Sequence, residues 1–342
     1  VYYQSVENGS INRDVYAIKV DGKSKVRLSS KTGTNSATFS PNFQYFINTY
    51  SSATSAPTYT LNDSKTGAVV KTIVSNEAVE QKLAKYDVTS KEFFVLTTEK
   101  GHQLNAWMIK PKNFDPTKKY PVFMYQYSGP GSQQVDNAWN SIDDYWFMML
   151  AQQGYIVACV DGRGTGYKGA AFKKCTYKEL GKYEVEDQID AAKVIGKYNY
   201  VDASRIGIFG WSYGGFMSSN CLFQGADVFK MAIAVAPVTS WRYYDSIYTE
   251  RYMQTPQENA SGYDNNSPIN HVSKLKGNFL LIHGTADDNV HVQNTMKMVE
   301  ALVQANKQFD WAIYPDKNHG IYGGKTRLQL YTKMTNFIKE KL

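Results

Sequence analysis

The sequence predicts an α/β domain with a mostly parallel sheet covered on both faces, preceded by a segment of short antiparallel strands. From residue 121 onward, apolar strand-like runs alternate with helix-like segments, which is the pattern of strands joined by crossover helices. Residues 1 to about 75 contain only short strand-like runs separated by turn residues. The chain has 342 residues, 42% of them hydrophobic and 20% charged, so it can bury a sizeable core.

The N-terminal segment contains four predicted strands, at residues 14–19, 45–50, 58–61 and 68–74, which we expect to form one antiparallel sheet. A lone sheet of this size leaves a face uncovered, whereas a propeller blade buries its faces against neighbouring blades. We therefore predict that residues 1–86 are the terminal part of a β-propeller, its last blade, with partner blades upstream. The α/β domain is expected at 87–342. The start at Val1, without an initiator Met or a leader-like segment, suggests a trimmed or fragmentary chain.

The remaining elements follow from apolar periodicity and turn residues. A short helix is predicted at 77–86, and strands at 92–98 and 104–109 flank Lys100 and Gly101 as a hairpin would. The elements after the hairpin, in order, are strand 121–127, helix 143–153, strand 155–160, helix 184–198, strand 206–209, helix 214–224, strands 231–235 and 279–282, helix 291–306, strand 309–314 and helix 326–341.

Charge and cysteine content exclude several functions. The net charge is +7, but the basic residues are scattered, whereas a nucleic-acid site needs them clustered. Cys159, Cys175 and Cys221 form neither a disulfide framework nor a metal-ligand spacing. No apolar run is long enough to span a bilayer. We expect a globular protein that needs no metal and no organic cofactor.

A motif for nucleophilic chemistry lies at Gly210-Trp-Ser-Tyr-Gly214, which fits G-x-S-x-G. The apolar strand 205–209 precedes it and a helix-like stretch follows it, as a strand-to-helix elbow requires. Small residues at both ends permit the tight turn that lifts a serine hydroxyl above the sheet. The motif alone also occurs by chance in glycine-rich turns, so the flanking elements carry the interpretation of Ser212 as a nucleophile.

A serine hydroxyl needs a base to take its proton and a carboxylate to hold that base. Asp287 follows the predicted strand 279–282, and His319 follows the predicted strand 309–314. Their loops leave the carboxyl edge of the sheet, where Ser212 also lies, and the order Ser, Asp, His is the one used with this elbow. We predict Ser212, Asp287 and His319 as a catalytic triad.

Alternatives to these assignments remain open from sequence alone. Asp288 could replace its neighbour as the orienting carboxylate, whereas Asp316 is expected at the surface. His283 is expected to be a packed or hydrogen-bonded residue at a strand end rather than the base. The other histidines lie in a predicted hairpin, in a loop and beside the acid loop, at His102, His271 and His291.

The tetrahedral oxyanion of acyl transfer needs two hydrogen-bond donors. The backbone N–H of Tyr213, directly after the nucleophile, is one by geometry. The second should come from the loop after strand 121–127, which lacks the HGGG run of many lipases and esterases. The phenol of Tyr127 is the donor available there, and the alternative is that this ring only packs.

With these motifs the chain resembles the prolyl oligopeptidase family of serine peptidases, and within it the dipeptidyl peptidase branch. The resemblance implies an α/β-hydrolase domain preceded by a propeller blade, and it spans the whole catalytic domain. Its most specific parts are the Trp-Ser-Tyr-Gly-Gly elbow and the Tyr-Tyr-Asp segment ending at Asp245. The matching stretches are 125–130, 161–164, 184–188, 210–215, 236–245, 248–253 and 283–291.

The resemblance also implies the roles of individual residues. It makes Ser212, Asp287 and His319 the triad, Tyr127 the side-chain oxyanion donor, and Asn289 a hydrogen-bond donor to a substrate carbonyl. A proline ring is apolar and rigid and has no N–H, so a pocket of aromatic side chains suits it. The alternative is that the aromatic rings implied for this pocket only pack in the core. The residues implied for this penultimate-residue pocket are Tyr213, Val238, Trp241, Tyr244, Tyr248 and Val290.

In this family the propeller supplies paired glutamates that hold the free substrate N-terminus, and it also supplies an arginine. By resemblance only its last blade lies in this chain. Glu184 and Glu186 are not that pair, because they open a predicted helix whose macrodipole suits an acidic first turn. Selectivity for free N-termini is therefore an inference from the resemblance.

The sequence thus predicts a serine exopeptidase that releases N-terminal dipeptides after Pro or Ala through an acyl-enzyme. The alternatives are another peptidase of this family, an esterase on the same fold, or a non-catalytic relative. The resemblance further implies a peptide substrate, a homodimer, an upstream propeller segment, and a periplasmic, secreted or cell-surface setting.

Overall fold

The computed structural model describes all residues, 1–342, which divide into two compact units. Unit 1 comprises Val1–Glu92 and Val135–Gln152, and unit 2 comprises Phe93–Gln134 and Gln153–Leu342. The predicted domain limits, 1–86 and 87–342, stay a prediction. None of the helices is both long and apolar enough to cross a bilayer.

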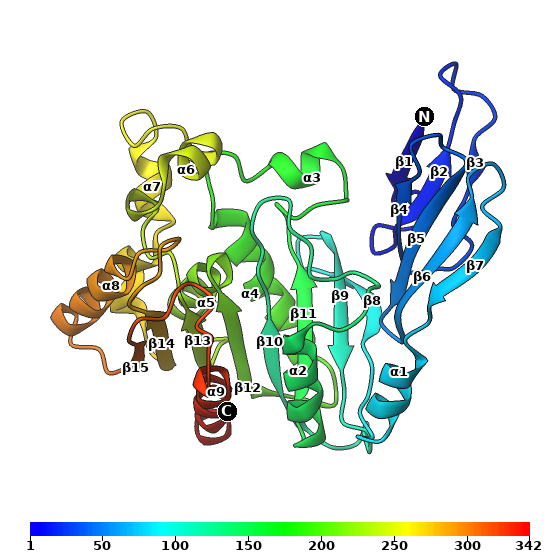
Figure 1. Cartoon of the computed structure of the whole chain (residues 1–342). Helices are drawn as coiled ribbons and strands as arrows, with labels where there is room; N and C mark the ends of the chain where they lie inside the picture. The colour runs from blue at the N-terminus through cyan, green and yellow to red at the C-terminus, as the bar shows by residue number, and fades with distance from the viewer. The chain divides into compact units, whose positions relative to one another are not determined.

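Unit 2 is built on an eight-stranded mixed sheet (Figure 1). The strands from β11 through β10 and β12 to β15 run parallel, and β9 lies antiparallel beside β11. The strand order is β15-β14-β13-β12-β10-β11-β9-β8. The strands are β8 (Glu92–Thr97), β9 (Gln103–Ile109), β10 (Tyr120–Tyr125), β11 (Ile156–Asp161), β12 (Val201–Trp211), β13 (Met231–Val235), β14 (Asn278–Gly284) and β15 (Asp310–Tyr314).

Helices connect these parallel strands, and α5 packs against β12 and β13 while α4 packs against β12. The helical segments of unit 2 are α3 (Ala170–Lys174), α4 (Lys182–Gly196), α5 (Tyr213–Gln224), η1 (Trp241–Tyr243), α6 (Ser246–Met253), α7 (Ala260–Asn265), η2 (Pro268–Lys274), α8 (Gln293–Gln304) and α9 (Thr326–Lys341). Every residue of β11 and β13 is buried, because strands covered on both faces carry continuous apolar runs. The prediction of a doubly covered parallel sheet is confirmed.

Most element limits agree with the prediction within two residues, and β13 and α9 agree fully. Strand β12 begins at Val201, earlier than the predicted Ile206. The residues in between, Asp202 to Arg205, are polar or small and are at most half-buried, so the apolar pattern could not reveal them. The short helices α3, α6 and α7 and the two 3-10 segments were not predicted.

Unit 1 contains two sheets, so the prediction of one four-stranded sheet was wrong. Strand 14–17 belongs to a three-stranded sheet of order β1-β2-β3, and the four-stranded antiparallel sheet has the order β4-β5-β6-β7. The missed strand β4 reads Thr-Asn-Ser-Ala-Thr-Phe and offers no apolar run to detect. The strands are β1 (Tyr2–Ser5), β2 (Asp14–Ala17), β3 (Val26–Arg27), β4 (Thr34–Phe39), β5 (Tyr45–Ser52), β6 (Ser55–Asp63) and β7 (Val69–Val74).

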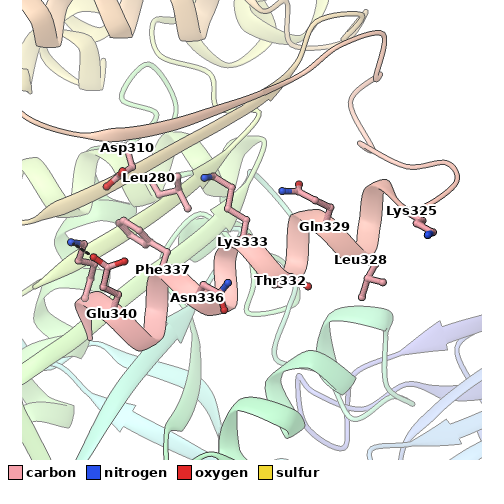
Figure 2. Close-up of a pocket in the computed structure, with 11 residues that line it drawn as sticks. Leu280, Asp310, Lys325, Leu328, Gln329, Thr332, Lys333, Asn336, Phe337 and Glu340 are labelled. Atoms are coloured by element: carbon pink, nitrogen blue, oxygen red, sulfur yellow. Dashed lines mark ion pairs between the residues drawn. The ribbon is translucent and has the colours of Figure 1, made fainter.

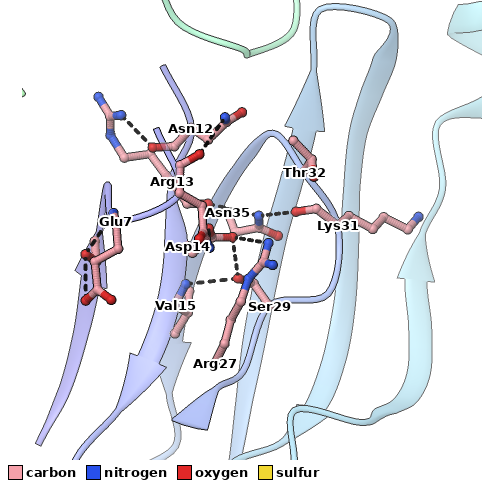
Figure 3. Close-up of polar contacts among 12 residues, drawn as sticks. Glu7, Asn12, Arg13, Asp14, Val15, Arg27, Ser29, Lys31, Thr32 and Asn35 are labelled. Atoms are coloured by element: carbon pink, nitrogen blue, oxygen red, sulfur yellow. Dashed lines mark hydrogen bonds and ion pairs between the residues drawn. The ribbon is translucent and has the colours of Figure 1, made fainter. Parts of the chain in front are cut away.

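A buried carboxylate joins the short strands of the first sheet. Asp14 is 1% exposed and accepts hydrogen bonds from Arg27 at 2.7 Å, Ser29 at 2.9 Å and Asn8 at 2.9 Å (Figure 3). A buried charge is tolerated when it is paired and fully hydrogen-bonded. Asp14 thus links β2 to residues 8, 27 and 29 through its carboxylate.

Unit 1 also contains two helices, α1 (Glu77–Ala84) and α2 (Ile142–Gln152). Lys91 and Asp144 form a buried ion pair of 2.9 Å within this unit. The side-chain oxygen of Asn137 accepts from the backbone N–H of Ala53 at 3.0 Å, and the backbone N–H of Asn137 donates to the carbonyl of Ile11 at 2.8 Å. These contacts attach residues 135–152 to the N-terminal strands rather than to their sequence neighbours.

Candidate active site

Ser212 lies between β12 and α5 in a strained backbone conformation, with φ of 62° and ψ of −118°. Positive φ is uncommon for a residue with a side chain and marks functional turns. The neighbouring glycines allow the tight turn, since a Cβ on Gly210 would lie 2.4 Å from the backbone of Gly214. A Cβ on Gly214 would lie 2.6 Å from the carbonyl oxygen of Gln126. The predicted elbow is therefore present, with the serine at its apex.

Asp287 and His319 meet above the carboxyl edge of the sheet, after β14 and β15. The His319 Nδ1 lies 2.7 Å from Asp287 Oδ2. The Asp287 side chain is fully buried, whereas that of His319 is 23% exposed. Because β12, β14 and β15 are parallel, their carboxyl ends bring residues far apart in sequence to one edge.

The Asp287 carboxylate accepts four hydrogen bonds. Oδ1 accepts from the backbone N–H groups of Asn289 at 3.0 Å and Val290 at 2.9 Å. Oδ2 accepts from His319 and lies 3.2 Å from Nε2 of His283. Burial alone would raise the pKa of Asp287, but the hydrogen bonds from the two histidines hold it well below its usual range. Asp287 is therefore ionised at neutral pH, as a group that stabilises an imidazolium must be.

The indole of Trp211 ties the loop of His319 to the elbow, because its Nε1 donates to the backbone carbonyl of His319 at 2.9 Å. The Ser212 hydroxyl shares a hydrogen bond with the hydroxyl of Tyr127. No hydrogen bond joins Ser212 to Nε2 of His319 in this structure. Such catalytic hydrogen bonds often tighten only when substrate is bound.

Two donors lie beside Ser212 at the place predicted for the oxyanion. The N–H of Tyr213 is the first of α5 and has no partner within the helix. Tyr127 follows β10, and burial raises its pKa although the hydrogen bond to Ser212 lowers it, so its phenol keeps its proton at neutral pH.

Gln126 sets the position of Tyr127 and was not predicted as a functional residue. It is buried, and its Nε2 donates to the Gly214 carbonyl at 2.8 Å and to Ser218 at 3.0 Å. The two donor segments, after β10 and at the start of α5, are thus linked by side-chain hydrogen bonds. A polar residue at the end of an otherwise apolar strand was the signal that could have revealed it.

Aromatic rings gather around Trp241, as the predicted pocket requires. Its ring centroid lies 5.4 Å from that of Tyr213, 6.0 Å from Tyr244 and 6.1 Å from Tyr248. Val238 and Val290 belong to the same apolar cluster, against which Tyr127, Tyr244 and Tyr248 pack. The hydroxyl of Tyr244 donates to Asn289 Oδ1 at 2.7 Å. Tyr213, Trp241, Tyr244 and Tyr248 thus form one cluster of rings on or beside η1, α6 and the elbow. Val238 and Val290 lie in the wider apolar core of unit 2, and their place in a substrate pocket stays a prediction.

A buried carboxyl lies behind the elbow. Glu184 is 0% exposed in the first turn of α4, where the sequence placed it. It accepts hydrogen bonds from the hydroxyl of Tyr213 at 2.8 Å and from the backbone N–H of Gly181 at 3.0 Å. Burial raises its pKa to about 8. Glu184 thus holds the ring of Tyr213. Acidic residues are common in the first turn of a helix, so the sequence did not reveal this contact.

The alternatives left open by the sequence resolve as follows. Asp288 is exposed, and the hydrogen bond to His319 comes from Asp287 instead. His283 is fully buried and hydrogen-bonded at the end of β14, as expected. His271 bonds the carbonyl of Asn265 at 2.7 Å, and His291 is exposed beside the acid loop.

A cavity lies elsewhere in unit 2, between α9 and the edge of the sheet. It has a volume of about 670 Å³ and shares no lining residue with the predicted site. Figure 2 shows Lys333 and Phe337 of α9 pointing toward Leu280 and Asp310. Its lining carries both acidic and basic side chains, among them Asp310, Glu340 and Lys333.

Comparison with known proteins agrees with this geometry. Residues 141–342 match the family model of the prolyl oligopeptidase family, and residues 1–57 match the model for the N-terminal region of dipeptidyl peptidase IV. A probable dipeptidyl-aminopeptidase B of Sclerotinia sclerotiorum is 40% identical over 345 residues, covering 99% of this chain and 37% of that protein. The chain thus spans little more than a third of the length of this curated relative.

Solved structures show the same likeness. The crystal structure of Porphyromonas gingivalis dipeptidyl peptidase 4 superposes with a TM-score of 0.97 at 52% identity, covering 100% of this chain and 48% of that one. A putative dipeptidyl aminopeptidase IV from Bacteroides ovatus gives a TM-score of 0.90 at 32% identity, covering 97% and 47%.

Unit 2 is an α/β-hydrolase fold with a serine at the elbow and a bonded Asp–His pair at the same sheet edge. Within that class, the match over residues 141–342 places the chain in the prolyl oligopeptidase family, to which it belongs.

Proposed function

We propose that this chain carries the catalytic machinery of a serine exopeptidase that releases dipeptides from peptide N-termini after Pro or Ala. The observation that carries the proposal is the buried Asp287–His319 hydrogen bond of 2.7 Å beside an elbow serine. The names of the relatives, dipeptidyl-aminopeptidase and dipeptidyl peptidase, support the substrate class.

In the proposed reaction the Ser212 hydroxyl turns from Tyr127 toward His319 and attacks the scissile carbonyl. His319 Nε2 takes the hydroxyl proton and later gives it to the leaving amine. Asp287 keeps the Nδ1 proton in place and stabilises the imidazolium. Water then attacks the acyl-enzyme by the same route, with His319 again acting as base and then as acid.

The oxyanion of the tetrahedral intermediate would be held by the Tyr127 phenol and the N–H of Tyr213. The N–H of Tyr213 lies at the N-terminus of α5, whose dipole also favours negative charge. Because the pKa of Tyr127 is raised, its phenol remains a donor across the neutral pH range.

The pocket proposed for the penultimate residue is the aromatic cluster around Trp241. Its rings offer flat apolar faces to a proline, and the pKa of Tyr244 is raised to about 12 by burial and nearby anionic groups, so its hydroxyl stays neutral. Asn289 receives the Tyr244 hydroxyl, which leaves its amide N–H group to bond a substrate carbonyl.

We further propose that residues 1–86 are the last blade of a propeller in the longer protein and that the protein forms a homodimer. The four-stranded antiparallel sheet β4-β5-β6-β7 has the strand number of a blade. All residues of β7 are exposed, including four Val and Ile side chains, so this sheet offers apolar surface for a neighbouring blade. Sedimentation velocity of the full-length protein tests the dimer.

Labelling with a fluorophosphonate tests the nucleophile. The chain should be labelled covalently, and Ser212→Ala should abolish the label, whereas Ser219→Ala should leave it unchanged because Ser219 bonds only the Gly215 carbonyl. Release of Gly-Pro from an anilide by the full-length protein should then exceed cleavage of a short acyl ester and of an N-blocked proline substrate. Preference for the ester would overturn the peptidase assignment, and absence of labelling would favour a non-catalytic relative.

A further inference from the structure

We propose that His283 is a positioning residue for the reaction: it donates a second hydrogen bond to the carboxylate of Asp287 and thereby sets how that carboxylate holds His319. This inference rests on the proposed function and deepens it. Both imidazoles lie within hydrogen-bond distance of the same oxygen, Asp287 Oδ2. Nδ1 of His319 is 2.7 Å from it, and Nε2 of His283 is 3.2 Å from it.

The surroundings of His283 define its tautomer. Its Nε2 faces two acceptors, Asp287 Oδ2 and the carbonyl oxygen of Val290 at 2.8 Å, so Nε2 carries the proton. Its Nδ1 lies 2.7 Å from Thr295 Oγ1, a hydroxyl of α8 that can donate to it. The orientation of the His283 imidazole is therefore held from both sides.

The position of His283 makes it a fixed part of the scaffold. It is 0% exposed at the end of β14 and pairs with Ile313 of β15 in the sheet. Thr295 is also 0% exposed. Because β14 and α8 both hold the ring, the second donor is preorganised before any substrate binds.

Sharing one carboxylate oxygen between two donors has an electrostatic consequence. The titratable groups around Asp287 are the two histidines and the phenol of Tyr244. A hydrogen bond from His283 disperses the charge on Oδ2, which weakens the attraction between that oxygen and protonated His319. Removing His283 should therefore strengthen the attraction of Asp287 for the protonated form of His319 and also loosen the orientation of the carboxylate.

A purely structural role is the rival explanation, because Nε2 of His283 also bonds the carbonyl of Val290. That bond would stabilise the turn between Asp287 and Val290 without influencing His319. The two explanations differ in what happens to the His319 proton, and stability measurements alone do not separate them.

Three variants separate them. In His283→Leu the donor is lost, whereas in His283→Gln an amide N–H group stands close to the position of Nε2. In Thr295→Val the imidazole stays and its Nδ1 partner is lost. His271→Gln, in a histidine that bonds Asn265 away from the site, is the matched control. Each is made in the full chain and labelled with a fluorophosphonate between about pH 5 and pH 9, which measures activation of Ser212 without a bound peptide.

We expect His283→Leu to lower the labelling rate constant at its pH plateau by about tenfold, a part of the 10²–10⁴ that a general base supplies. We also expect its acid limb to move to higher pH. His283→Gln should restore the rate to within about threefold, and Thr295→Val should shift the profile in the same direction by less. The low-field proton resonance of the His319 Nδ1–H should move in His283→Leu and stay in place in His271→Gln.

The outcomes are distinguishable. If the parent chain is labelled and His283→Leu keeps both its rate and its acid limb, the inference is overturned while the proposed function stands. If the parent chain is not labelled, the proposed function fails, and the His319 resonance then decides: an unchanged resonance in His283→Leu overturns the inference too. Should His283→Leu fail to fold, an unchanged profile and resonance in Thr295→Val overturn it.

Discussion

The indole Nε1 of Trp211 donates a hydrogen bond of 2.9 Å to the backbone carbonyl of His319. Trp211 is the last residue of β12 and directly precedes Ser212, so this bond joins the elbow to the loop of the proposed base across 108 residues of sequence. Its effect is to fix the backbone on which the imidazole stands. The side chain that precedes the proposed nucleophile therefore helps to position the proposed base.

Replacing Trp211 by Phe should test this link. The ring packing is largely kept and the donor is lost, so the free energy of unfolding should fall by only about 1 kcal/mol. Activity depends on sub-ångström placement of the base, so the fluorophosphonate labelling rate should fall by about tenfold or more. Trp311→Phe, at a ring that is 46% exposed on β15, is the control and should change neither quantity. Equal effects of the two variants would show that the hydrogen bond is dispensable.

The phenol of Tyr127 is open to a direct test. Tyr127→Phe removes one proposed oxyanion donor and should lower kcat by about 10²- to 10³-fold with little change in KM. Stability should change little, because the hydroxyl bonds only Ser212. Tyr125→Phe is the matched control. It removes a hydroxyl on the preceding strand that donates to Gln134 at 2.8 Å, and kcat should stay within about threefold of the parent value. A Tyr127→Phe variant with full kcat would remove Tyr127 from the mechanism.

Crowding at the elbow gives a prediction for stability. Gly210→Ala would place a Cβ 2.4 Å from the backbone of Gly214, and because these atoms are backbone rather than a flexible side chain, the clash cannot be relieved cheaply. We expect the free energy of unfolding to fall by about 3 kcal/mol or more, with loss of labelling. Gly196→Ala is the control, since its Cβ would meet Ala203 at 3.4 Å, an ordinary contact. Urea unfolding of both variants measures the difference, and equal stability would contradict the close approach.

Glu184 makes stability depend on pH. Its folded pKa is raised from 4.5 to about 8 by burial, so between these values the unfolded carboxyl is ionised while the folded one keeps its proton. Stability from this group is therefore present below about pH 4.5 and is lost as pH rises toward 8, by up to about 1.4 kcal/mol per pH unit.

Urea unfolding near pH 5.5 and near pH 8 measures this dependence. Glu184→Gln cannot titrate, so its stability should fall less between the two values than that of the parent chain. Glu300→Gln, on the exposed side of α8, should leave the parent's dependence unchanged. An identical pH dependence in the parent chain and in Glu184→Gln would mean that Glu184 is ionised in the fold.

The parts predictable from sequence were those set by local pattern. The elbow around Ser212 could be identified because its glycines and its flanking strand and helix lie within a few residues. Asp287 and His319 could be placed because parallel strands deliver their carboxyl ends to one edge. The partners of buried polar groups could not be predicted, since Glu184 and Tyr213 lie 29 residues apart and only the folded chain brings them together. Strand β4 was missed for another reason, because its pairing comes from backbone hydrogen bonds and not from apolar side chains.

The backbone of Ser212, at φ of 62°, is tolerated only because β12 and α5 hold it from both sides. A glycine would adopt the same angles without a steric penalty, so the position favours a residue that cannot perform the chemistry. Selection for stability alone would therefore favour replacing Ser212 by glycine. The serine at this position therefore lowers the free energy of unfolding slightly, and in exchange it places a hydroxyl where it can react.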